Sequence, residues 1–206
     1  MAEIAQYQGA IFTLCLTRLQ SNKKVAASLV GAWSTYVARY GAAALKQQLE
    51  GIQPGLCNMI LRGVWSEHLG YVHGPILRKT AAVSTAQLLS ETDMISDAAS
   101  FGPLLQALLL MLLADSGLSS APAELNVEEL PGVEEGEETS YAAAYVSLHF
   151  ASNNEVDLYA EHSAAGFLKA SVARLLASHG AALQAIIATI MAALPADKQA
   201  GVQALV

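Results

Sequence analysis

The fold is decided by the stretch Arg39-Tyr40-Gly41-Ala42-Ala43-Ala44-Leu45, followed by Leu49-Glu50-Gly51-Ile52-Gln53-Pro54-Gly55-Leu56. Gly41 and Gly51 suit helix C-termini, where a left-handed conformation costs a glycine nothing sterically. Pro54 is expected near the first turn of the following helix, where its missing N–H is not needed. The stretch therefore predicts the end of one helix, a short second helix and a turn into a third. If Gly51 has a positive φ, replacing it by valine should destabilise this hairpin by about 1 kcal/mol or more.

The same alternation of apolar segments with Gly or Pro stops extends over the rest of the 206 residues. Apolar residues make up 53% of the chain and are mainly Ala and Leu, which favour helix over strand. About nine helices are expected, at residues 2–20, 23–40, 42–50, 55–71, 75–90, 104–114, 140–151, 157–179 and 181–194. They would form antiparallel pairs at intervals of roughly 35–45 residues, which is the period of HEAT-type repeats.

This pattern predicts an all-α fold, an α-α superhelix of antiparallel HEAT-like helix hairpins. Residues 1–115 are expected to form HEAT-like hairpins, residues 116–139 an acidic flexible loop, and residues 140–206 the C-terminal HEAT-like helices. Residues 91–100 are expected to be a polar connector, with Pro103 starting the next helix, and residues 196–206 to add a short turn.

Two groups of residues also resemble a known family. The first comprises Tyr40-Gly41-Ala42-Ala43-Ala44-Leu45, Gly51-Ile52-Gln53-Pro54 and Met59-Ile60-Leu61. The second is Tyr145-Val146-Ser147-Leu148-His149-Phe150-Ala151, which follows an acidic segment. In their order and spacing these blocks resemble the C-terminal region of the exportin-2 family, the importin-α re-exporters. The resemblance runs from about residue 11 to the C-terminus.

The resemblance implies the C-terminal part of a nuclear export receptor, which returns importin-α to the cytoplasm in complex with Ran-GTP. Such a receptor shuttles between nucleus and cytoplasm through the nuclear pore. Members of the family are several times longer than this chain, so Met1 is expected to be an internal or mispredicted start. The N-terminal repeats that the family uses for its main Ran contacts would then be missing. The alternative is a free-standing helical-repeat scaffold or adaptor without transport activity.

Charge is unevenly distributed along the chain. Residues 1–79 hold eight Lys or Arg against three acidic residues, whereas residues 80–168 hold no Lys or Arg against fourteen acidic residues. Nucleic acid is not expected as a partner of the acidic part, because phosphate binding needs basic contacts. The acidic run predicts either a solvated loop or a contact with a basic protein surface. The candidate partner-binding residues are Glu128, Glu129, Glu134, Glu135, Glu137 and Glu138. Importin-α or Ran is the partner that the resemblance implies.

No catalytic signature is recognisable, so the chain is not expected to be an enzyme and no cofactor is predicted. His68 and His73 lie five residues apart, but a zinc site would need two further ligands. A cluster of glutamates without spaced Asp or Asn ligands does not match a calcium loop. Cys15 and Cys57 have no motif spacing, which indicates free thiols in a reducing compartment.

Trp33 and Trp65 lie on apolar helix faces and are predicted to anchor the core. The alternative for Trp65 is a hydrophobic pocket for a partner, since tryptophan is enriched at binding hot spots. Residues 101–114 are apolar all round but too short to span a bilayer. They are therefore predicted to form a buried core helix, and no membrane insertion is expected.

Overall fold

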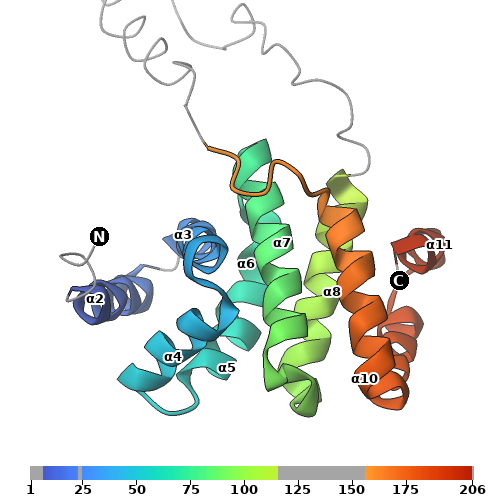
Figure 1. Ribbon diagram of the computed structural model, residues 1–206, viewed down its shortest axis with the longest axis horizontal. Helices are drawn as coiled ribbons and strands as arrows, with labels where there is room; N and C mark the ends of the chain where they lie inside the picture. The colour runs from blue at the N-terminus through green and yellow to red at the C-terminus, as the bar shows by residue number, and fades with distance from the viewer. Residues whose placement is uncertain (1–6, 23–24, 116–155, 206) are drawn as a thin grey trace, which may run out of the picture.

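The structure, a computed structural model, describes residues 7–22, 25–115 and 156–205 (Figure 1). In chain order its elements are α2 (Gln8–Ser21), α3 (Ala26–Tyr40), α4 (Ala42–Ile52), α5 (Leu56–Ile60), the π-helical turn η2 (Leu61–Trp65), α6 (Ser66–His68), the 3-10 turn η3 (Leu69–Tyr71), α7 (Pro75–Glu91), the 3-10 turn η4 (Asp93–Ser96), α8 (Ala98–Asp115), α10 (Ala164–Ala193) and α11 (Ala196–Leu205). The described ranges contain no strand, which confirms the predicted all-α fold.

Helices that follow each other in the chain run antiparallel at three places. In α2 and α3, Gln8 accepts a hydrogen bond from Tyr36 and Phe12 stacks on Trp33. Between the helical segment 56–71 and α7, the indole N–H of Trp65 donates to Thr85. The start of α7 is joined to the end of α8 through ion pairing of Arg78 with Asp115. Arg78 also donates to the carbonyls of Gly70 and Val72, so residue numbers rise along the segment 56–71 as they fall along α7. The Arg78–Asp115 pair links the first turn of α7 to the last turn of α8, as antiparallel packing requires.

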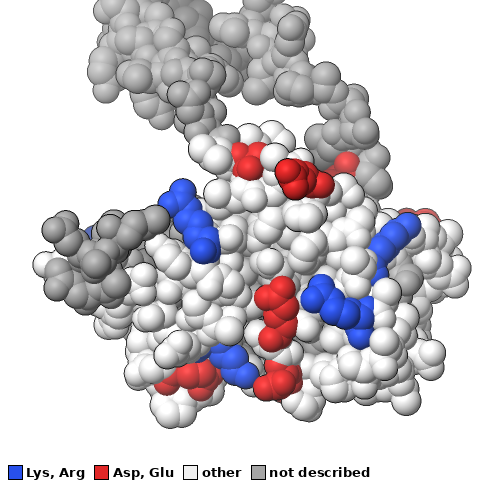
Figure 2. Space-filling model, in the orientation of Figure 1, with Lys and Arg blue, Asp and Glu red and all other residues white. Residues whose placement is uncertain are grey.

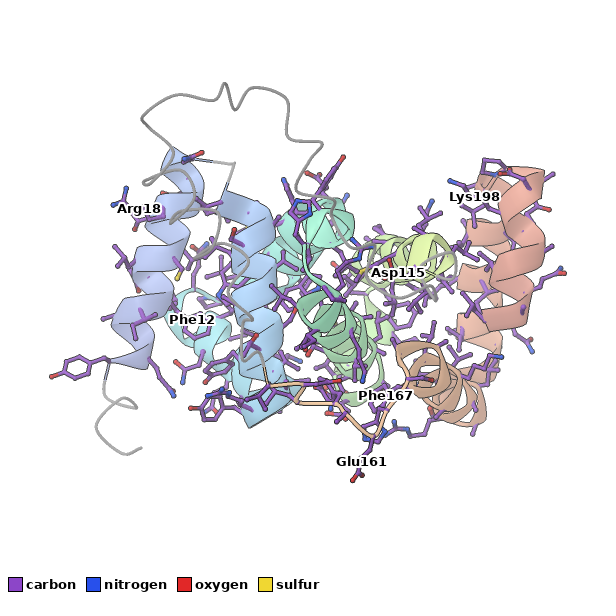
Figure 3. All side chains as sticks on the ribbon, turned by 90° about the horizontal axis from the view of Figure 1, so that it is seen from above. Phe12, Arg18, Asp115, Glu161, Phe167 and Lys198 are labelled. Carbon is purple, nitrogen blue, oxygen red and sulfur yellow. The ribbon has the colours of Figure 1, made fainter. Side chains whose placement is uncertain are left out.

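A second set of contacts places α3, α7 and the first half of α10 side by side (Figure 1). Leu77 of α7 covers Gly31 of α3, and Ser84 of α7 donates a hydrogen bond of 2.8 Å to the carbonyl of Ser34. Residue numbers rise together in these two pairs, so α3 and α7 run in the same direction. The α8 helix packs against both α7 and α10, and α11 packs at the far side of α8 (Figures 1 and 3).

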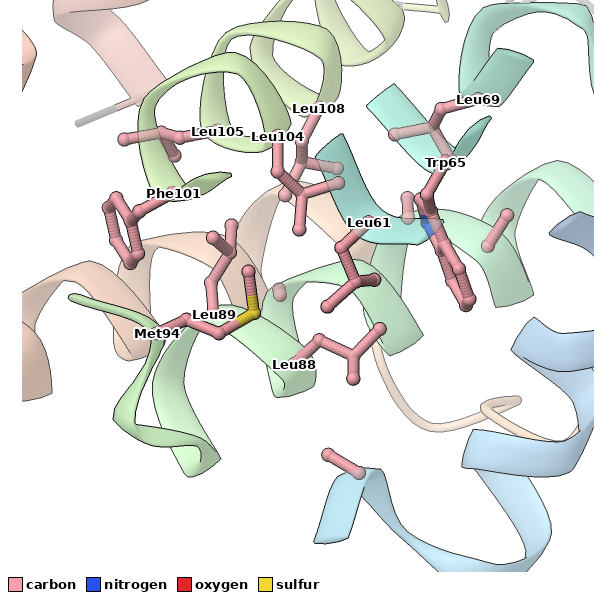
Figure 4. Packing of buried hydrophobic residues seen from close by; sticks show 14 of the residues in the cluster. Leu61, Trp65, Leu69, Leu88, Leu89, Met94, Phe101, Leu104, Leu105 and Leu108 are labelled. Carbon is pink, nitrogen blue, oxygen red and sulfur yellow. The ribbon is translucent and has the colours of Figure 1, made fainter. Parts of the chain in front are cut away.

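One hydrophobic core joins these helices, from Phe12 in α2 to Val202 in α11. Its centre lies where the segment 56–71 meets α7 and α8, and holds leucines with Trp65 and Phe101 (Figure 4). Trp33 and Trp65 are both buried, which confirms their prediction as core anchors. The alternative for Trp65 is wrong, because its side chain is 0% exposed and unavailable to a partner.

The turn between α4 and α5 corrects one helix boundary. Gly51 lies inside α4, and the residue with positive φ is Gly55, at +80°. Glu50 explains the shift, because its carboxylate accepts the backbone N–H groups of Gly55 and Cys57 and so organises the start of α5. Gly41 ends α3 with a φ of +88°, as its position predicts.

The two glycines are therefore expected to respond in opposite directions. Gly55→Ala should destabilise the protein by about 1 kcal/mol, because a side chain is strained at positive φ. Gly51→Ala should stabilise it by about 0.5–1 kcal/mol, since nothing lies within 4 Å of a Cβ there and alanine favours helix. Urea denaturation of both variants measures the difference. A stabilising effect of Gly55→Ala would contradict this assignment of the turn.

The expected connector at residues 91–100 is mostly helical. Met94 and Ile95 of η4 are buried, and α8 begins at Ala98, five residues before Pro103. Asp97 stabilises this start because its carboxylate accepts a hydrogen bond of 2.7 Å from the hydroxyl of Ser100. The prediction that Pro103 starts the helix was wrong: Pro103 lies inside α8, in its second turn, where the proline ring removes one backbone hydrogen bond of the helix.

The C-terminal helices also differ from the prediction. Residues 157–163 are not helical, and α10 begins at Ala164 after Ser163, whose hydroxyl accepts the Gly166 N–H. The expected break at Gly180 is a kink at His179 (φ −136°, ψ 34°) within one continuous element. Residues 196–205 form the full helix α11 rather than a short turn.

Two helices of the described chain, α8 and α10, are long and apolar enough to cross a membrane by length and composition. Eight residues of α8 are buried against neighbouring helices, among them Leu104 and Leu108, so its apolar character serves the core as predicted. The kink at His179 divides α10 into two shorter halves, and each half buries leucines or isoleucines in the same core.

Candidate functional site

The candidate partner-binding residues Glu128, Glu129, Glu134, Glu135, Glu137 and Glu138 lie outside the described residues, as do the expected loop 116–139 and helix 140–151. What the structure describes are the two positions that flank this part of the chain. One is Asp115, at the end of α8, and the other is the non-helical segment 156–163. We call the side chains that hold them the acidic-segment base: Arg78, Lys79, Asp115, Asp157 and Tyr159.

Arg78 holds the first flank. Its guanidinium donates to both carboxylate oxygens of Asp115, with the shortest N–O distance 2.7 Å. The same group donates to the carbonyls of Gly70 (2.9 Å) and Val72 (3.0 Å), which end the helical segment 56–71. A planar guanidinium with five donors is suited to such a junction. Arg78 therefore ties three chain segments together at one end of α7.

Lys79, the next residue of α7, holds the second flank. Its ammonium group lies 2.7 Å from Oδ2 of Asp157, and Oδ1 of Asp157 accepts the backbone N–H of Tyr159 at 2.9 Å. Burial raises the pKa of Asp157, but the hydrogen bonds from Lys79 and Tyr159 and the charge of Lys79 outweigh it. The net pKa therefore lies below the ordinary value, and the carboxylate is ionised at neutral pH.

Tyr159 anchors the segment 156–163 on α7. Its hydroxyl donates to the side-chain carbonyl of Gln87 at 2.7 Å and lies 3.4 Å from the hydroxyl of Ser84. The ring is buried beside His162 and Phe167, at centroid distances of 6.3 and 6.5 Å. Burial raises the pKa of Tyr159, so its hydroxyl remains protonated and able to donate. Figure 3 shows Phe167 and Glu161 at this side of the molecule.

Both flanks of residues 116–155 are thus held by neighbouring basic residues on one helix. Arg78 and Lys79 are the last Arg and Lys before the stretch 80–168, which contains neither residue type. Red side chains lie where the grey residues join the body in Figure 2. The side chains of the acidic-segment base hold Asp115 and the segment 156–163, which flank residues 116–155, on α7. Sequence reasoning missed this base, although the Arg78-Lys79 pair at the edge of the acidic stretch was a usable signal.

The ion pair of Asp157 predicts a pH dependence. Because its pKa is lowered in the folded state, its contribution to stability is present above the ordinary pKa of 3.8 and is lost as pH falls through the lower folded value. Asp157→Asn should therefore be less stable than wild type at neutral pH, with the difference shrinking below pH 3.8. Urea denaturation of both proteins at several pH values tests this. A constant difference across that range would contradict it.

The histidines and the cysteine considered as metal ligands or as a nucleophile do not form a site. The ring Nδ1 of His68 is hydrogen-bonded to the carbonyl of Val64, whereas His73 is exposed at the end of the segment 56–71. No group of three His, Cys, Asp or Glu in the described ranges could hold a metal ion. Burial, assisted by Glu50, raises the pKa of Cys57 to about 11, so its thiol is protonated and a poor nucleophile at neutral pH.

Two surface hollows occur among the described residues. One of about 410 Å³ lies beside the α10 kink and is lined by Ser90, Glu91, Thr92, Asp93, Ile95, Ser96, Leu175, Ser178 and His179. The other, of about 300 Å³, lies between α8 and α11 and is lined by Leu110, Leu113, Ala114, Asp197 and Lys198. The first has a mainly polar lining that includes the carboxylates of Glu91 and Asp93, and the second is lined mainly by apolar side chains.

Known proteins resemble this chain over most of its length. Residues 1–205 match the profile of the family described as "CAS/CSE protein, C-terminus". The chain belongs to this family. Among curated relatives, Exportin-2 of Oreochromis niloticus is 32% identical over 161 residues, which cover 75% of this chain and 16% of that protein. Exportin-2 of Homo sapiens is 31% identical over the same shares. The sequence resemblance to the exportin-2 family is therefore supported.

The CAS/CSE match concerns one region of much longer proteins, since this chain spans about a sixth of the length of the curated relatives. No solved structure matches significantly. The family assignment thus rests on sequence, and the described residues have the all-α fold that the apolar pattern predicts.

Proposed function

We propose that this chain forms the C-terminal helical part of a nuclear export receptor of the exportin-2 kind, which returns importin-α to the cytoplasm in complex with Ran-GTP. The observation that carries the proposal is the CAS/CSE C-terminal match over residues 1–205. The receptor would move between nucleus and cytoplasm. Its work would be binding and release rather than catalysis.

The structure supports this proposal through its architecture. Helices that bury one another in series leave extended outer surfaces for protein partners, which suits a receptor that wraps around its cargo. In the proposed mechanism Ran-GTP and importin-α favour the same conformation of the receptor, so each raises the affinity for the other. GTP hydrolysis on Ran would then release the cargo.

A chimera tests this function. The region of Homo sapiens exportin-2 that matches this chain is replaced by residues 1–206, and importin-α export is followed in permeabilised cells depleted of the endogenous receptor. We expect export to depend on added Ran-GTP and to reach a level close to that of intact exportin-2. The control is the human protein truncated before the matching region. A folded chimera no more active than this truncation would favour the free-standing scaffold instead.

The acidic segment is proposed to face a basic surface of importin-α or Ran. Single exposed charge pairs contribute little, ~0–1 kcal/mol each. Several together raise the association rate and make it salt-dependent. Changing Glu128, Glu129, Glu134, Glu135, Glu137 and Glu138 to Gln in the chimera should therefore slow association more than it speeds dissociation.

Surface plasmon resonance at two salt concentrations measures this effect, with importin-α and Ran-GTP as analytes. The melting temperature should be unchanged, because glutamate side chains are almost never fully buried unless they are paired. A control replaces Glu67 and Glu91, which are exposed on helices of the described part of the chain, by Gln. Equal association rates for the six-residue variant and the unsubstituted chimera at low salt would mean that the segment is a solvated linker.

A further inference from the structure

The α11 helix packs on the outer side of α8 and depends on a small set of contacts. Val202 is the residue of α11 that is fully buried, and Leu205 is partly buried against the same core. Gly201 lets the backbone of α11 come close to α8, because a Cβ at this position would lie 2.5 Å from Cδ2 of Leu113. The helix is therefore held on α8 by one side of its last two turns.

The α11 helix is weak apart from this packing. It has 10 residues, fewer than the roughly 12–15 that an isolated helix needs to be stable in water. Gly201 in its interior lowers helix stability further relative to alanine. The side chain of Gln199 donates to the carbonyls of Met191 and Leu194, so these bonds hold the turn after α10 and not the contact with α8. We therefore expect α11 to undock and unfold locally more readily than α8 or α10.

The contact between α8 and α11 is also incompletely filled. Lys198, Val202 and Leu205 are spaced i, i+4 and i+7, so they lie on one face of α11. The first of them is charged and exposed, and it lines the hollow of about 300 Å³ that continues the interface of α8 with α11 (Figure 3). We call the α8 side of this hollow the α8 groove, which consists of Leu110, Leu113 and Ala114. The groove has room for a third apolar side chain where α11 has a lysine.

We propose that the α8 groove binds an amphipathic helix of a partner protein, and that this helix displaces α11. The partner helix has apolar residues at i, i+4 and i+7, with Leu, Ile or Phe at the position of Lys198. It has Gly or Ala at the position of Gly201, because a larger residue there would meet Leu113. Filling the hollow adds apolar burial that α11 does not make, so such a helix has the higher affinity for α8.

The sequence of α11 argues against a second copy of this chain as the occupant. The α11 helix of another copy carries the same Lys198, so an exchange of helices between copies gains no contact in the hollow. A partner with an apolar residue at this position does gain one. This inference does not depend on the proposed function, since it concerns only α8 and α11.

Undocking of α11 sets the apparent affinity of the α8 groove. A partner binds only the fraction of molecules in which the groove is uncovered, so its apparent affinity falls in proportion to that fraction. Substitutions that loosen α11 should therefore strengthen binding, and those that tighten it should weaken binding. The α11 helix thus acts as an autoinhibitory segment.

A peptide competition experiment with the full chain of residues 1–206 tests this proposal. The probe is a fluorescently labelled peptide of residues 194–205 that carries Lys198→Leu, and fluorescence anisotropy measures its binding. The control peptide carries Val202→Gln and Leu205→Gln in addition. We expect the wild-type chain to bind the probe at least about tenfold more tightly than the control peptide.

Three variants of the full chain then separate the cover from the groove. Val202→Ala removes part of the buried contact of α11 and should strengthen probe binding about tenfold. Lys198→Leu lets α11 fill the hollow itself and should weaken probe binding about tenfold. The matched control is Gln203→Leu, which also adds a leucine to α11 but at an exposed position, and should change binding by no more than about twofold. Circular dichroism melts establish that all three are folded.

The opposite effects of Lys198→Leu in the peptide and in the full chain distinguish this mechanism from general stickiness. Absence of probe binding by wild type would overturn the proposal. Equal probe binding by wild type and Lys198→Leu, or no gain from Val202→Ala, would also overturn it. So would a wild-type dimer in analytical ultracentrifugation that Lys198→Leu converts to monomer, since a second copy would then occupy the groove.

Discussion

Replacing Trp65 by alanine is expected to lower the free energy of unfolding by about 3–5 kcal/mol, the largest effect of any single change considered. Trp65 is fully buried at the π-helical turn η2, and its ring stacks on Trp33 at a centroid distance of 6.4 Å. The indole N–H also donates a hydrogen bond of 2.9 Å to the hydroxyl of Thr85. The substitution removes this packing and leaves a cavity between α3, the segment 56–71 and α7.

Two further variants separate the causes. Trp65→Phe keeps an aromatic ring but loses the N–H, and should cost about 1–2 kcal/mol. Thr85 remains hydrogen-bonded to the carbonyl of Ala81, so its hydroxyl is not left unpaired. Tyr71→Ala, at an exposed aromatic residue of the same segment, should change stability by no more than about 0.5 kcal/mol. Guanidinium denaturation measures all three, and a loss below about 1 kcal/mol for Trp65→Ala would contradict the central role of this contact.

Arg78→Met is expected to destabilise the protein by about 2 kcal/mol, because the charge-assisted hydrogen bonds of the guanidinium to the Asp115 carboxylate and to the Gly70 and Val72 carbonyls are lost together. The side chains of Arg78 and Asp115 are only 20% and 27% exposed, so solvent replaces these bonds incompletely. The methylene groups of methionine preserve most of the packing of the arginine stem. Arg78→Lys should retain the charge but still lose about half of this stability, since an ammonium group cannot bridge the same acceptors.

The matched control is Arg62→Met on the exposed side of the segment 56–71, expected to change stability by no more than about 0.5 kcal/mol. A double-mutant cycle with Asp115→Asn isolates the ion pair from the bonds to the Gly70 and Val72 carbonyls. If Arg78→Met and Arg62→Met have equal effects, Arg78 does not hold the junction of α7, α8 and the segment 56–71.

The acidic-segment base also shows why a candidate site could be predicted only in part. The charge distribution showed that an acidic stretch, which holds the candidate partner-binding residues, begins after residue 79. It could not predict that Arg78 and Lys79 pair with Asp115 and Asp157, because these partners are 37 and 78 residues away in the chain. Which carboxylate meets which cation depends on how α7, α8 and the segment 156–163 pack.

The amino-acid sequence by itself determined the helical class and several helix ends. Gly41 ends α3 and Pro75 starts α7 as predicted, because a left-handed glycine and a proline in the first turn act through local backbone geometry. The apolar composition of residues 101–114 correctly indicated a core helix for the same reason, since length and hydrophobicity are local properties.

The structure was needed to show where helix boundaries depart from those that local residue propensities predict. Gly55 rather than Gly51 took the left-handed position because Glu50 binds the N–H groups that follow, and α8 begins before Pro103 because Met94 and Ile95 are drawn into the core. Residues 157–163 stay non-helical because Asp157 and Tyr159 bind α7. The contacts of Asp157 and Tyr159 reach more than 70 residues along the chain, whereas those of Glu50 reach only five and seven. The propensity differences that are overridden are at most about 1 kcal/mol per residue for most residues and about 3 kcal/mol for a proline inside a helix.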